Sequence, residues 1–163
     1  MSGAENVLYS FRATSDGRNP VAPLIDGNGV LYGTTPSGGI GDCLEPTGGS
    51  CGTVYSITTS GAEKVIYMFP YGGARGAVPR SGLMDVHGTL YGTTYYGGTS
   101  GPPQSGDGTV FSVTTDGTEN VLHRFFWWWR IPHSGLGERG RQALWHRMVR
   151  HLLADPVMHV LAS

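Results

Sequence analysis

Short runs of β-branched and aromatic residues, separated by glycine-rich stretches, recur along the first 125 residues. Each run ends at Gly, Asp, Asn or Pro, which is typical of strands rather than helices. In Thr109-Val-Phe-Ser-Val-Thr114, alternation places Val110 and Ser112 on one face and Phe111 and Val113 on the other. The pattern therefore predicts an all-β chain.

These runs belong to a sequence repeat with a period of 56 to 59 residues. One element occurs three times, as Glu5-Asn-Val-Leu-Tyr-Ser-Phe11, Glu63-Lys-Val-Ile-Tyr-Met-Phe69 and Glu119-Asn-Val-Leu-His-Arg-Phe125. A fixed period of this length indicates a tandem-repeat architecture in which each copy is one supersecondary unit.

Three further elements occur twice each. They are Ala22-Pro-Leu-Ile-Asp26 with Ser81-Gly-Leu-Met-Asp85, Val30-Leu-Tyr-Gly-Thr-Thr35 with Thr89-Leu-Tyr-Gly-Thr-Thr94, and Gly52-Thr-Val-Tyr-Ser-Ile-Thr58 with Gly108-Thr-Val-Phe-Ser-Val-Thr114. In the second copy, strands are predicted near residues 81–86, 89–94, 109–114 and 119–125. Residues such as Asn28-Gly29 and His87-Gly88 supply the positive φ angles that tight hairpins need.

Four short strands in a repeat of this length predict tandem antiparallel blades of an incomplete β-propeller. We divide the chain into a closing strand of a preceding blade (1–11), a first repeat (12–69), a second repeat (70–125) and a tail (126–163). Two complete blades are too few to close a ring, so further blades are expected in the parent protein.

The repeated motifs resemble the GloVer tandem repeat of bacterial choice-of-anchor proteins. Leu-Tyr-Gly-Thr-Thr, Gly-Thr-Val-Tyr/Phe-Ser and Glu-Asn-Val-Leu-Tyr-Ser-Phe carry the resemblance, which covers residues 5–125. It implies a propeller-like array on an exported, surface-anchored protein, and it supplies no catalytic residues.

The residues after Phe125 depart from the repeat. All four tryptophans lie there, and five arginines accompany only two acidic residues. Trp has a single codon, so Trp127-Trp-Trp129 read one base later encodes glycines, as a third repeat would require. We therefore expect an irregular or helical tail, produced by a frameshift in a third repeat. The alternative is a genuine basic amphipathic helix over 141–153 that binds a membrane or a partner.

Composition narrows the functional classes. Net charge is −1 and only 14% of residues are charged, which argues against nucleic-acid binding. No apolar run is long enough to span a membrane and no leader follows Met1. For an exported parent, whose expected location is extracellular or at the cell surface, the leader and anchor are thus expected outside this sequence.

Cys43 and Cys51 flank a glycine-rich loop of the first repeat. Two cysteines joined through a short loop favour a disulfide in an oxidising compartment, and two free thiols are the alternative. The second repeat has no cysteine in its corresponding loop, so such a disulfide would only reinforce one loop.

No cofactor or metal is expected. Turns such as Asp26-Gly-Asn-Gly29 lack the spaced oxygen ligands of a calcium loop, and the glycine-rich segments lack a phosphate-binding lysine. Glu5, Glu63 and Glu119 recur at one repeat position, which indicates a structural role.

The unrepeated loops are where a binding function is expected, at 12–19, 36–50, 70–79 and 95–107. In a propeller these loops emerge on one face, where Tyr71, Tyr95 and Tyr96 could stack against a sugar or a peptide; ordinary loop aromatics are the simpler interpretation.

The sequence thus predicts a non-catalytic repeat segment of an exported protein that serves as an interaction scaffold. A fragment of a propeller lyase or glycosidase and a truncated, nonfunctional reading frame are the alternatives. An enzyme would need a convergent acid/base pair or metal site, and the sequence offers no unique candidates.

Overall fold

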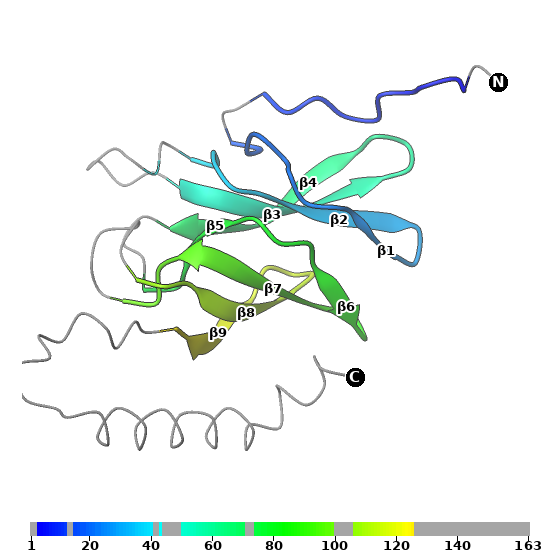
Figure 1. Cartoon of the computed structure of the whole chain (residues 1–163). Helices are drawn as coiled ribbons and strands as arrows, with labels where there is room; N and C mark the ends of the chain where they lie inside the picture. Colours follow the sequence, from blue (N-terminus) through cyan, green and yellow to red (C-terminus); the bar gives the residue numbers. More distant parts are fainter. Residues whose placement is uncertain are drawn as a thin grey trace, which may run out of the picture. The chain divides into compact units, whose positions relative to one another are not determined.

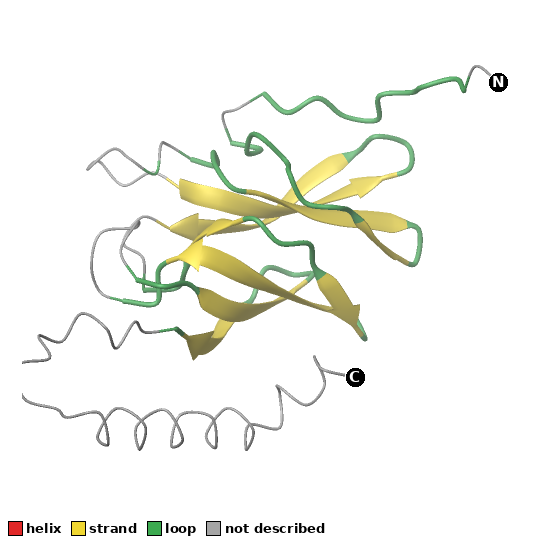
Figure 2. Cartoon of the chain, viewed as in Figure 1, coloured by secondary structure: helices red, strands yellow, loops and turns green. Residues whose placement is uncertain are grey.

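The computed structural model describes residues 3–12, 15–40, 43, 50–70, 74–99 and 106–125. These residues contain nine strands and no helix, and the strands form two antiparallel sheets (Figures 1 and 2). The all-β prediction is confirmed. The tail at 126–163 lies outside the described residues.

The first sheet is built from four strands in sequence order, each paired with the next. They are β1 (Ile25–Gly27), β2 (Val30–Thr35), β3 (Ser50–Thr58) and β4 (Glu63–Pro70). The second sheet repeats this order with β6 (Met84–Val86), β7 (Thr89–Tyr96), β8 (Thr109–Thr114) and β9 (Glu119–Arg124). The elements that the two repeats share therefore form equivalent strands, whereas the earliest copy of the element that occurs three times, residues 5–11, forms no strand.

A fifth strand, β5 (Ala77–Pro79), extends the second sheet. It pairs with the far end of β7, where Ala77 lies opposite Tyr96 and Pro79 opposite Thr94. The first sheet has only an isolated bridge at the equivalent place, between Arg18 and Ser37. The strand predicted over 81–86 begins only at Met84, because the chain bends between β5 and β6.

The first hairpin of each sheet closes through a two-residue turn. Asn28 and Gly29 have φ of 56° and 81°, and His87 and Gly88 have 52° and 82°. Two successive positive φ angles match the right-handed twist of the paired strands. Gly29 N donates to Asp26 Oδ1 at 2.8 Å, and the second turn has the same bond to Asp85.

The core lies where the two sheets pack against each other, as the stacked ribbons of Figure 1 show. Its largest fully buried side chains come from both sheets and include Phe69, Phe111, Leu90, Val54 and Val113. Both faces of β8 are buried, including Val110 and Ser112. One core therefore joins the two repeats.

Candidate functional site

A disulfide joins Cys43 to Cys51, and both residues are buried. Cys51 lies near the start of β3, so the bond ties the loop before this strand to the sheet. Asp107 takes the equivalent place in the second repeat. The bond is therefore a feature of the first repeat alone.

Tyr95 and Tyr96 belong to the end of β7, although the sequence analysis places them in a loop. Strand alternation sends them in different directions: Tyr95 is 56% exposed, whereas Tyr96 packs against the core. Their rings still meet edge to face at 4.7 Å, and the Arg80 guanidinium lies 5.1 Å from the centre of the Tyr95 ring. Tyr71 lies outside the described residues.

An open depression of about 340 Å³ adjoins these rings and is lined by Thr94, Tyr95, Tyr96, Gly106 and Asp107. One exposed ring with a cation over it is a surface feature that can stack against a planar or apolar ligand. Arg80 was missed by the sequence analysis, because Val21 takes its position in the first repeat.

The recurring threonines hold the strands together beneath a glycine. Thr35 and Thr53 share a buried hydroxyl hydrogen bond of 2.8 Å, and Thr94 and Thr109 share one of 2.9 Å. A Cβ on Gly76, which has a φ of +97°, would lie 2.5 Å from Thr109 Oγ1. In each repeat, one glycine backbone passes directly over the threonine pair. This close contact explains why the glycine and the two threonines recur in both repeats.

The glycine of Leu-Tyr-Gly-Thr-Thr receives an aromatic ring from the neighbouring strand. Gly33 lies opposite Tyr55 in the β2–β3 register, and Gly92 lies opposite Phe111 in the β7–β8 register. A Cβ on either glycine would come within 2.7 Å of that ring. The ring thus takes the space that a side chain would need.

Two aromatic residues of β4 join the first repeat to the second. Phe69 is fully buried and packs edge to face on Phe111 at 5.0 Å, while Tyr67 packs on Phe69 at 5.1 Å. The segment before the first repeat makes the same arrangement: Phe11 packs on Tyr55 at 4.9 Å. We call the β4 contact the second junction and the contact of residues 5–11 the first junction.

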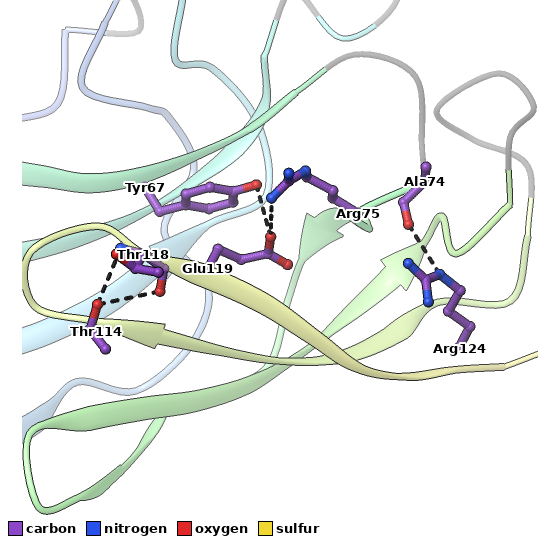
Figure 3. Close-up of polar contacts among 7 residues, drawn as sticks. All are labelled: Tyr67, Ala74, Arg75, Thr114, Thr118, Glu119 and Arg124. Carbon is purple, nitrogen blue, oxygen red and sulfur yellow. Dashed lines mark hydrogen bonds and ion pairs between the residues drawn. The ribbon is translucent and has the colours of Figure 1, made fainter.

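A buried glutamate completes the second junction (Figure 3). Glu119 Oε2 accepts hydrogen bonds from Tyr67 Oη at 3.3 Å and from Arg75 Nη1 at 3.0 Å. The glutamate side chain is fully buried, whereas that of Arg75 is mostly exposed. Burial, and then the charge of Glu119, raise the pKa of Tyr67 to about 12. The ion pair with Arg75, in the same repeat, therefore offsets the charge of this carboxylate, and the hydrogen bond from Tyr67 links it to the first repeat.

The first junction has a different charge arrangement. Asp16 stands where the second junction has Arg75, and its Oδ2 accepts from Tyr9 Oη at 2.8 Å. That hydrogen bond is the main reason that the pKa of Tyr9 rises to about 12. Burial, and then the charge of Asp16, raise the pKa of Glu63, and the hydrogen bond with Tyr9 opposes the shift. Two carboxylates thus lie beside one tyrosine, whose hydroxyl donates to Asp16.

The sequence analysis identifies the recurring glutamates as structural, but it misses the exchange of Asp16 for Arg75. The signal was present, because each of these residues directly precedes a glycine of the repeat, 59 positions apart.

Within the described part of the chain, no three His, Cys, Asp or Glu residues gather as a metal site would require. No helix in the same part could cross a membrane.

The sequence matches the family described as the Gloeobacter/Verrucomicrobia repeat over residues 2–144. The matched range is wider than the predicted 5–125 and includes residues 126–144, which the sequence analysis assigns to the tail. No curated protein and no solved structure is found to match the chain. The motifs quoted for the resemblance lie within the matched range. The chain therefore belongs to the Gloeobacter/Verrucomicrobia (GloVer) repeat family.

Proposed function

We propose that the chain is a non-catalytic repeat segment of an exported protein, and that its sheets are successive blades of a scaffold. The observation that carries this proposal is the junction that occurs twice. Phe11 on Tyr55 and Phe69 on Phe111 are equivalent ring contacts at 4.9 and 5.0 Å. A contact used twice in one direction builds an array, and further blades would close it into a propeller.

Export is supported by the Cys43–Cys51 disulfide, because such bonds persist mainly in oxidising compartments. The bond holds a loop at an end of the sheet where the repeats differ in sequence. In an extracellular scaffold, such a bond can reinforce a long glycine-rich loop.

The surface around Tyr95 and Arg80 supports a role in binding. Tyr96 and Arg80 hold the exposed Tyr95 ring from two directions, so little freedom would be lost when a ligand stacks on it. A carbohydrate, or a protein with an exposed apolar side chain, has the chemistry for this surface.

Location and redox state in the source cells test the proposal together. Intact cells would be treated with protease, and peptides of β3 and β4 would be quantified before and after lysis. We expect these peptides to be lost from intact cells, and Cys43 and Cys51 to resist alkylation until they are reduced. Peptides that stay protected until lysis, with both cysteines alkylated directly, would contradict export.

Binding needs its own measurement, because an exported protein can lack a ligand at this surface. A glycan and peptide array probed with the purified chain should give signals that Tyr95→Ala removes. Val7→Ala, at an exposed apolar residue outside the loops where binding is expected, is the matched control. Signals that survive Tyr95→Ala would place the binding surface elsewhere.

A further inference from the structure

The outer end of the second repeat presents an unused copy of the junction residues. Phe125 corresponds to Phe69, but it is 36% exposed where Phe69 is fully buried. It also packs edge to face with the ring that precedes it by two residues, His123, at 4.8 Å. Thr93 is likewise exposed and donates to Ser81 Oγ of its own repeat at 3.0 Å, whereas its counterpart Thr34 is buried and donates to the carbonyl of Ser81 in the other repeat.

The opposite end, on the first repeat, lacks a cover that its counterpart has. Leu24 and Leu83 each lie against the glycine of their own Leu-Tyr-Gly-Thr-Thr motif. Leu83 is only 6% exposed because the first sheet packs over this region, whereas Leu24 is 45% exposed. The surface around Leu24 is therefore of the kind that a preceding blade covers.

Residues 5–11 cover only part of this end. They supply Phe11 for Tyr55 and place the Leu8 carbonyl against the turn at Gly61, as β4 does with Ile66 and Gly117. However, residues 5–11 form no strand, and Val7 remains 66% exposed. At the second junction β2 and β3 also contact β5, and β1 contacts β6. A single segment cannot make those additional contacts.

We propose that the outer end of the second repeat docks on the first repeat of a second copy of this chain, with β9 taking the place of residues 5–11. The two segments share Glu-Asn-Val-Leu and a phenylalanine two residues after the Tyr9 or His123 ring. The docked copy reproduces the second junction: Phe125 packs on Tyr55, and Thr93 donates to the carbonyl of Ala22. The other strands of its blade cover Leu24.

Charge favours the second copy over residues 5–11. Asp16 and Glu63 place two carboxylates beside the ring position that Tyr9 fills. In β9 that position is His123, whose imidazole can carry a proton and so neutralise one of the two charges. Because the contact joins different surfaces of the two copies, it is head-to-tail and can continue to further copies.

This inference rests on the proposed blade scaffold, but it can fail alone, since it is tested on the purified chain without reference to export. Leu24→Asp disables one end and Phe125→Asp disables the other. Sedimentation velocity of the full chain should show association that rises with concentration. Each substitution should weaken this association by about thirtyfold or more, because a charge would be buried at the centre of the interface.

Mixing the two variants gives the decisive result. Leu24→Asp keeps an intact outer end, and Phe125→Asp keeps an intact first repeat, so an equimolar mixture should form a 1:1 dimer that grows no further, although each variant alone is monomeric. Ile40→Asp, at an exposed apolar residue outside both ends, should associate like the unmodified chain. Circular dichroism checks that each variant retains its sheets.

Phe11→Ala provides a second measurement that does not depend on those variants. It weakens the hold of residues 5–11 on Tyr55, so head-to-tail association should become several-fold tighter. A chain that stays monomeric at every concentration, variants that do not combine, or a Phe11→Ala chain that associates no more tightly would each overturn the proposal.

Discussion

The two repeats share the residues that build a sheet and differ in the residues that meet their surroundings. Both have the threonine pair, the glycine opposite an aromatic ring and the two-residue turn. They differ at Asp16 against Arg75, at Cys51 against Asp107, and in what covers Leu24 and Leu83. The recurring motif therefore specifies the four-stranded sheet, whereas its variable positions specify how each sheet is reinforced and joined.

The largest expected effect tests whether the two junctions are energetically different. Phe69→Ala removes a fully buried ring and should lower the free energy of unfolding by about 3–5 kcal/mol. Phe11→Ala removes the equivalent ring from a junction that is partly open, so its loss should be well under half as large. Urea unfolding of both variants measures the difference, and equal losses would show that the first junction is as complete as the second.

A somewhat smaller effect tests whether the two repeats are built alike. Gly76→Ala and Gly17→Ala each combine a positive φ with a Cβ that meets buried threonines, so each should cost about 3 kcal/mol. Gly88→Ala also has a positive φ but meets open space, so it should cost about 1 kcal/mol. If only one of Gly76→Ala and Gly17→Ala lowered the free energy of unfolding by about 3 kcal/mol, the two repeats would not be built alike.

The disulfide should stabilise the first repeat directly, and the second repeat only through the core that the two share. For a separation of 8 residues, loop closure predicts that Cys43→Ser with Cys51→Ser lowers the free energy of unfolding by about 2.5 kcal/mol. Reduction of the unmodified chain should reproduce the loss. Without urea, hydrogen exchange should locate the added local opening in β2 and β3, and a larger increase in β7 and β8 than in β2 and β3 would contradict a local role.

The smallest effect comes from the charges at the junctions. The folded-state pKa of Glu63 lies above its ordinary value of 4.5, so protonation of Glu63 stabilises the folded chain. This contribution to the free energy of unfolding is complete below pH 4.5 and is lost as the pH rises through the folded-state pKa. The urea midpoint should therefore fall as the pH is raised through this range. Glu63→Gln should abolish this part of the fall, and Asp16→Asn should reduce it.

Exchanging charges between the junctions sharpens that result. Arg75→Asp gives the second junction the charges of the first, so it should make the midpoint more sensitive to pH. Lys64→Asp, on an exposed residue of β4, controls for the change in net charge. Equal pH profiles for these two variants would show that position 75 has no special role.

The sequence predicted the strands well because each is short, alternating and bounded by glycine, and because every element could be checked against its copy. β5 escaped prediction because it contains Pro79 and pairs with the end of β7 across a bend, which no local pattern records. Tyr95 and Tyr96 were assigned to a loop because the first repeat has Pro36 and Ser37 there.

The candidate surfaces were harder to predict than the strands. Arg80 stacks on Tyr95 only because β5 and β7 are neighbours, and Tyr67 meets Glu119 only across the two repeats. Contacts between distant segments depend on tertiary packing, so a pattern read along the chain identifies the residues without their partners.

Hydrogen exchange followed by mass spectrometry across a urea series tests the central claim most directly, namely that the twice-used junction joins both repeats into one core. Amides of β2 and β3 report on the first sheet, and amides of β7 and β8 report on the second. We predict that both sets lose protection at the same urea concentration and that Phe69→Ala separates them. Two separate transitions in the unmodified chain would contradict the account.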